Sequence, residues 1–143
     1  MIRVKRTYEP RAAGDGRRVL VERLWPRGMK KEELQADEWL KGVAPSTTLR
    51  KWYGHRPELW EEFRQRYRKE LAGNRDAWSP LLEASRRGTV TLLYSAHDTE
   101  HNSAVVLLEF LGEQGRTRQP ARGQVSEQST SGRRPAAKPR TRR

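Results

Sequence analysis

The chain lacks cysteine altogether, and it also lacks any long apolar run. The absence of thiols excludes disulfides, thiol catalysis and thiolate metal sites. A membrane-spanning helix needs about 18 or more apolar residues in succession, and no run approaches that length. The first residues alternate in polarity and do not form an apolar signal segment, so we expect a cytoplasmic protein with no membrane partner.

The last fifth of the chain is poor in acidic and in large apolar residues. Residues 115–143 carry nine Lys/Arg and one acid, whereas every Trp, Tyr and Phe lies before residue 115. Such a segment cannot bury enough apolar surface to offset its ordering entropy. We therefore predict a compact domain over residues 1–114 and a disordered, basic tail rich in Arg, Pro, Gly and Ser over residues 115–143.

Two apolar segments that run abruptly into polar clusters indicate the fold class. Val19–Leu24 and Thr89–Tyr94 read as strands buried on both faces, and Ile2–Arg6 alternates like a short strand of undetermined direction. Helical patterns separate the two buried strands, and a long helical crossover implies parallel pairing. The prediction is an α/β domain with a small, mostly parallel sheet and packed helices.

The helical patterns between and after these strands have recognisable ends. Ser46 can cap a helix through its hydroxyl, Pro57 suits a first turn, and Gly88 stops a helix. The predicted helices cover Lys31–Leu40, with Leu34 and Trp39 turned inward, Thr47–Tyr53, Pro57–Leu71, Asp76–Arg87 and a last helix with Ala104, Leu107, Leu108 and Leu111 on one face.

Polar residues follow both buried strands, and ligands of open α/β sheets bind where strands end. Guanidinium groups bind carboxylate or phosphate bidentately, so we expect an anionic small molecule at this edge. Alternatively, Arg23 and Arg27 pair with Asp37 or Glu38 and only fix their loop. The candidate ligand-binding residues are Arg23, Arg27, Arg50, Tyr94 and Asn102.

His97 and Asp98 are the candidates for proton transfer, because histidine titrates near neutral pH. The alternative is that Asp98 or Thr99 caps the following helix. Whether the chain is an enzyme stays open. We predict no cofactor and no metal site: His97 and His101 straddle a strand-to-helix junction, a weaker signal than a His-Glu-x-x-His motif.

Two basic segments raise the possibility of a nucleic-acid partner. The cluster Arg50, Lys51, Trp52, His55 and Arg56 could stack on and neutralise a nucleotide or a single strand, or Trp52 could simply belong to the core. The cationic tail could contact phosphates without sequence specificity, or act only as a solubilising extension. The alternatives to anion binding are thus a nucleic-acid accessory protein and a non-catalytic interaction module.

Four stretches of the chain carry a resemblance to a known family. Leu20–Gly28, Trp39–Lys41, Ala44–Trp52 and Val90–Asn102 resemble the YeaO-like branch of the bacterial domain-of-unknown-function 488 family. The resemblance implies a compact α/β domain of a bacterial cytoplasm and no established reaction. Other branches carry a Cys–His pattern near the last strand, where this chain has Tyr94 and His97 without cysteine. The basic tail lies outside the resemblance.

Overall fold

The computed structural model of the chain describes residues 1–118. The chain divides into two units, Met1–Leu111 and Gly112–Arg143, and the architecture below is that of the first. Of the second unit, the description covers only residues 112–118, which belong to the last helix. The predicted disordered tail falls, from residue 119 onward, outside the described residues.

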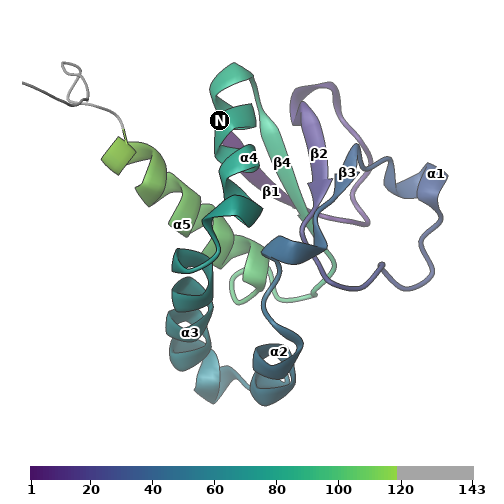
Figure 1. Ribbon diagram of the computed structural model, residues 1–143. Helices are drawn as coiled ribbons and strands as arrows, with labels where there is room; N and C mark the ends of the chain where they lie inside the picture. The colour runs from purple at the N-terminus through teal and green to yellow at the C-terminus, as the bar shows by residue number, and fades with distance from the viewer. Residues whose placement is uncertain (119–143) are drawn as a thin grey trace, which may run out of the picture. The chain divides into compact units, whose positions relative to one another are not determined.

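A small parallel sheet forms the centre of the first unit (Figure 1). Its four strands lie in the order β1-β4-β2-β3, and every neighbouring pair is parallel. The prediction of an α/β domain with two central, parallel strands is confirmed, and the first strand proves parallel to its neighbour. The strands are β1 (Ile2–Arg6), β2 (Arg17–Leu20), β3 (Glu38–Trp39) and β4 (Val90–Tyr94).

The helices follow the predicted patterns with one exception, described below. The Ser46 hydroxyl accepts a hydrogen bond from the Leu49 N–H at 3.1 Å, which confirms the predicted cap. The helices are α1 (Lys31–Leu34), α2 (Thr47–Tyr53), α3 (Trp60–Ala72), α4 (Arg75–Arg87) and α5 (Ser103–Arg118), with 3-10 turns η1 (Ala13–Asp15), η2 (Lys41–Val43) and η3 (Pro57–Leu59).

The two faces of the sheet have different covers, because strand side chains alternate between faces. One face, here the helix-covered face, packs the side chains of Val19 and Leu92 against α2, α3, α4 and α5 in the main hydrophobic core. The opposite, loop-covered face joins Leu20 and Leu93 to Leu34 of α1 in a much smaller cluster. The loop-covered face therefore needs another source of stability.

A buried ionic network fills the rest of the loop-covered face. Arg18, completely buried, donates to the Asp15 carboxylate at 2.6 Å and to the Leu34 carbonyl at 2.8 Å, and Lys5 lies 3.0 Å from the same carboxylate. Burial by itself raises the pKa of Asp15, but hydrogen bonds from the Ala12 N–H, Lys5 and Arg18 hold that pKa well below its usual range. The Asp15 carboxylate is therefore ionised at neutral pH.

A glycine makes this network possible. Gly16 links Asp15 to β2 with a φ of +63°, and a Cβ there would lie 2.2 Å from the Thr89 carbonyl oxygen. The backbone at Thr89, directly before β4, therefore approaches residue 16 more closely than any residue other than glycine would allow.

The structure corrects two predicted segments. The second strand begins at Arg17 and ends at Leu20, because its register with β4 places Arg17 opposite Val90. The first helix ends at Leu34, because Gln35 adopts a left-handed conformation (φ 53°). Trp39, predicted on that helix, lies instead in β3, which exists only because it pairs with β2.

Candidate functional site

The carboxyl ends of three neighbouring strands bring polar residues together. Arg6 ends β1, Ser95 directly follows β4, and Glu22 lies two residues beyond β2. Because these strands are adjacent and parallel, their ends meet at one edge of the sheet. We call this edge, with the loop over residues 95–102, the carboxyl edge.

Arg6 is the cation of the carboxyl edge. Its Nε donates to the Ala96 carbonyl at 2.9 Å, and its Nη2 donates to the Ser95 carbonyl at 3.3 Å and contacts Nδ1 of His97 at 3.4 Å. Because a guanidinium group only donates, a hydrogen bond at this contact requires Nδ1 of His97 to accept and the ring proton to lie on Nε2. The guanidinium of Arg6 also lies 5.1 Å from the ring centre of Tyr8.

Glu22 ties the end of β2 to the end of β4. Its carboxylate accepts hydrogen bonds from the Ser95 N–H at 3.0 Å and from the Ser95 hydroxyl at 2.7 Å. Its own carbonyl accepts a hydrogen bond from the Trp39 indole at 2.6 Å. This set of bonds holds three strand ends in fixed positions, and so gives Glu22 a structural role.

Two buried tyrosines lie close to the charges of the carboxyl edge. Burial, and after it the negative charge of Glu9, raises the pKa of Tyr94, while Arg6 partly opposes that rise. Burial and the charge of Asp98 likewise raise the pKa of Tyr53. Both hydroxyls therefore stay protonated at neutral pH and can donate hydrogen bonds.

Asp98 organises the loop that enters α5. Its Oδ1 accepts from the N–H groups of Glu100 and His101, both at 2.9 Å, and its Oδ2 lies 3.0 Å from Nδ1 of His101. These backbone hydrogen bonds lower the pKa of Asp98. The cap of α5 is Asn102, not Asp98 or Thr99, because its Oδ1 accepts from the Val105 N–H at 3.0 Å.

Arg23 does not form the ion pairs with Asp37 or Glu38 that were considered for it, and it contacts backbone carbonyls instead. Its guanidinium donates to the carbonyls of Pro45 and Ala44, at 3.2 and 3.3 Å, and so holds the segment that leads into α2. The acids proposed as its partners are engaged elsewhere: Asp37 accepts from the Arg18 N–H, and Glu38 pairs with Arg17.

The other two predicted arginines are exposed. Tyr8 donates to the Arg27 carbonyl at 3.3 Å, which places the Arg27 main chain beside the segment that follows β1. Arg50 lies on the surface of α2, within the predicted basic-aromatic cluster. In that cluster, Trp52 is half-buried, packs on the core and carries the guanidinium of Arg66 4.3 Å from its ring centre.

Sequence reasoning missed Arg6 and did not assign Glu22 a role. Arg6 is the last residue of the predicted strand Ile2–Arg6, and Glu22 lies within the predicted strand Val19–Leu24, so both residue types were visible near strand ends. The missing information was the direction of β1, which decides whether Arg6 lies at the carboxyl edge or at the opposite edge.

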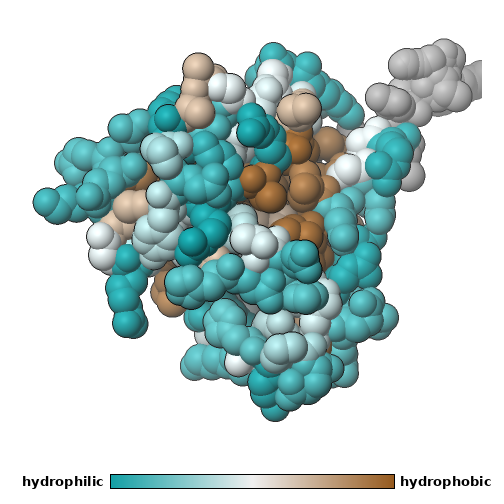
Figure 2. Space-filling model, turned by 180° about the vertical axis from the view of Figure 1, so that it is seen from behind, coloured by the Kyte–Doolittle hydropathy of each residue, from teal (hydrophilic) through white to brown (hydrophobic). Residues whose placement is uncertain are grey.

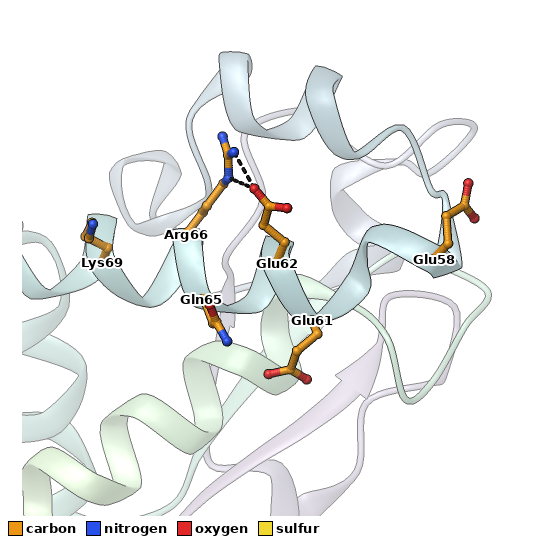
Figure 3. Close-up of a pocket in the computed structure, with 6 residues that line it drawn as sticks. All are labelled: Glu58, Glu61, Glu62, Gln65, Arg66 and Lys69. Carbon is orange, nitrogen blue, oxygen red and sulfur yellow. Dashed lines mark hydrogen bonds and ion pairs between the residues drawn. The ribbon is translucent and has the colours of Figure 1, made fainter.

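A separate surface hollow lies along η3 and α3, away from the strand ends (Figure 3). All of its lining residues come from one helical face, so it is a shallow depression rather than an enclosed cavity. The dashed lines mark the Glu62–Arg66 ion pair, in which both side chains are about half exposed. The lining residues are Glu58, Glu61, Glu62, Gln65, Arg66 and Lys69.

Residues 1–118 contain neither a metal-binding group of side chains nor a membrane-spanning helix. This part of the chain holds no group of three or more His, Asp or Glu side chains arranged to bind a metal ion. No helix in it combines the length and apolar character needed to cross a membrane.

Comparison with known families decides where the chain belongs. The family described as "Inactive DUF488-N3 subclade" matches residues 1–131. The chain belongs to the DUF488 family. The match extends past residue 114 and so includes part of the predicted basic tail, which was expected to lie outside the resemblance.

Bacterial relatives are similar over the same region. The chain is 44% identical over 110 residues to the uncharacterized protein YeaO of Escherichia coli, covering 77% of this chain and 96% of YeaO. It is 40% identical over 110 residues to the uncharacterized protein Rv3073c of Mycobacterium tuberculosis, covering 77% of this chain and 92% of the relative. No solved structure matches the chain significantly.

The stretches that resemble the DUF488 family occupy the positions that build the carboxyl edge. Leu20–Gly28 carries Glu22 and Arg23, and Val90–Asn102 comprises β4 and the loop organised by Asp98. Ala44–Trp52 contains the carbonyls that Arg23 binds and the Ser46 cap of α2. The family resemblance therefore follows the contacts that hold this edge together.

Proposed function

We propose that the carboxyl edge binds a small, singly charged anion such as a carboxylate, and that the chain catalyses no reaction on it. The observation that carries this proposal is the position of Arg6. The guanidinium uses Nε and Nη2 to hold the 95–97 backbone and His97, which leaves Nη1 to face a ligand. A half-buried guanidinium binds an anion more strongly than a fully solvated one, because less water screens it.

Two further donors support a ligand beside Arg6. His97 accepts from Arg6 through Nδ1, so its exposed Nε2–H can donate. The Tyr94 hydroxyl stays protonated, because burial raises its pKa. Arg27 remains a candidate third contact, since Tyr8 holds its main chain near the end of β1. Arg23, which holds the carbonyls of Pro45 and Ala44 through Nε and Nη2, also stays a predicted contact.

The acids of the carboxyl edge limit the charge of the ligand. Glu9 and Asp98 both lie close enough to Tyr94 to raise its pKa. Their charges repel a polyphosphate more strongly than a monoanion, because the Coulomb energy scales with ligand charge. A carboxylate is therefore a better ligand than a nucleotide polyphosphate.

The same residues argue against catalysis. Asp98 has a lowered pKa, whereas a general acid or base at neutral pH needs a raised one. Nδ1 of His97 is engaged by Arg6, and Glu22 is engaged by Ser95. The matching subclade is described as inactive, which supports a non-catalytic role.

Thermal unfolding of the full chain tests this proposal. Acetate, succinate, inorganic phosphate and tripolyphosphate would be compared at constant ionic strength. We expect the monocarboxylate to raise the melting temperature and Arg6→Gln to abolish that rise; saturation at about 100 times Kd corresponds to about 2.7 kcal/mol. Each shift is referred to the same variant without ligand, because Arg6→Gln also loosens the 95–97 loop.

Arg11→Gln is the matched control, because Arg11 is an exposed arginine whose nearest acid, Asp37, lies 3.9 Å away. It should leave the carboxylate-induced shift unchanged. An equal shift in wild type and Arg6→Gln, or a shift from tripolyphosphate alone, would overturn the proposal. New proton-transfer activity lost in Asp98→Asn would overturn its non-catalytic part.

A further inference from the structure

We propose that the free edge of β1 is a docking site for an extended segment of another protein, in which apolar and acidic residues alternate. Within the described residues, β1 pairs only with β4 and therefore ends the sheet on this side. An edge strand presents unpaired N–H and C=O groups that a further strand can use.

The ladder shows which groups of β1 remain open. The Met1 carbonyl accepts from the Val90 N–H at 2.8 Å, and the Thr7 N–H donates to the Tyr94 carbonyl at 2.7 Å. Because successive residues of a strand direct their backbone groups to opposite sides, Ile2, Val4 and Arg6 direct theirs away from β4.

One end of this free edge is closed. The Arg6 N–H donates to the Glu9 carboxylate at 3.1 Å, and the Arg6 carbonyl accepts from the Glu9 N–H at 3.1 Å. These Glu9 contacts involve only Arg6, so the outward-facing N–H and C=O groups of Ile2 and Val4 stay open to a further strand. The open stretch is therefore short, and we expect weak, reversible docking.

The side chains beside the open stretch differ between the two faces of β1. Ile2 and Val4 are partly exposed and pack on the main core, as does the partly exposed Leu108 of α5. Figure 2 shows a patch of hydrophobic side chains over β1 and α5 on this face of the molecule. An apolar side chain of a docked strand would extend that patch and lose contact with water.

The opposite face of β1 presents a positive charge. Arg3 is exposed, and its Nη1 donates to the Gly14 carbonyl at 3.1 Å. No acid pairs with it in the described part of the chain. Lys5, by contrast, already pairs with Asp15. A carboxylate opposite Arg3 on the docked strand would complete a cross-strand pair of opposite charge.

The same charge argues against a second copy of this chain as the occupant. Two copies of β1 related by a two-fold axis would run antiparallel. In the two longest such registers, Arg3 faces either Arg3 or Lys5 of the other copy, and like charges directly opposite each other destabilise a pair of strands. A segment of alternating acidic and apolar residues would match both the apolar face of β1 and the positively charged face with Arg3. A second copy of β1 would match only the apolar face.

Peptide titration of the isotope-labelled full chain tests the proposal. The probes are the blocked peptides Val-Glu-Val-Glu-Val and Val-Lys-Val-Lys-Val, and the readouts are chemical shift and hydrogen-exchange protection of the Ile2 and Val4 amides. We expect the glutamate peptide to protect both amides and to bind at least about tenfold more tightly than the lysine peptide. In Arg3→Glu we expect the lysine peptide to bind more tightly instead.

Two variants keep the test independent of folding. Val4→Pro removes an N–H that points away from β4, so the sheet keeps its ladder while docking is lost. Arg87→Glu makes the same charge change on another exposed arginine and should leave peptide preference unchanged. Equal binding of both peptides, no protection of the two amides, or a dimer dissociated by Val4→Pro would each overturn the proposal.

Discussion

The two faces of the sheet are held by different forces. The helix-covered face buries the larger core, in which α2, α3, α4 and α5 contribute apolar side chains. The loop-covered face has only three buried apolar residues in its cluster and relies on the Asp15–Arg18–Lys5 network beneath it. The hydrophobic effect, which is non-directional, thus stabilises the helix-covered face, whereas directional ion pairs and hydrogen bonds stabilise the loop-covered face.

The difference predicts how each face tolerates change. Apolar packing accepts substitutions of similar volume, because the loss depends mainly on buried area and cavity size. A buried ion pair does not, because removal of one partner leaves the other charged, desolvated and unpaired. The following predictions test that contrast, beginning with the largest effect.

Arg18→Met should cost about 3–5 kcal/mol of unfolding free energy, because it leaves the buried Asp15 carboxylate with Lys5 as its remaining cation and the Leu34 carbonyl without the Arg18 donor. Urea denaturation measures this loss. The double variant Asp15→Asn/Arg18→Met should lose less than the sum of the two single variants. A loss below about 1 kcal/mol would show that the network contributes little.

Leu107→Ala should cost about 2–5 kcal/mol, because it opens a cavity under α5 at a residue with no exposed surface. Leu107→Met is the volume-conserving control and should cost less than about 1.5 kcal/mol. If both variants lose the same stability in urea, the helix-covered face is as intolerant of change as the other face.

Acid should weaken the loop-covered face through Asp15. The folded-state pKa of Asp15 is lowered, so its ionised form contributes stability above the unfolded value of about 3.9. That contribution is lost as pH falls from about 4 toward the folded-state pKa, at up to about 1.4 kcal/mol per pH unit. Urea unfolding of wild type and Asp15→Asn across this range should show a shallower pH dependence in the variant.

Glu62→Gln should change stability by less than about 1 kcal/mol, although it breaks an Arg–carboxylate pair like that of Arg18 and Asp15. The Glu62–Arg66 pair is about half exposed, and water replaces the lost partner. The effect should also shrink at high salt. A loss comparable to that of Arg18→Met would mean that burial does not separate the two pairs.

Several elements of the fold were predictable because local chemistry specifies them. The Ser46 cap fixes the start of α2, and the spacing of Phe63, Tyr67 and Leu71 marks the buried side of α3. Of the carboxyl edge, the strand that ends in Tyr94 and the loop through Asp98 were likewise visible. The carbonyl partners of Arg23 were not predictable, because they lie about twenty residues away and carry no side-chain signal.

By itself, the sequence determined the fold class, the two central strands and the family, since these depend on apolar runs, helical periodicity and local motifs. Only the tertiary structure decided that β1 runs parallel to β4, which brings Arg6 to the carboxyl edge and leaves Ile2 and Val4 on a free edge. It also decided that Glu38–Trp39 forms a strand and that Arg18 is buried. These outcomes depend on pairing between segments far apart in the chain, and no local periodicity encodes such register.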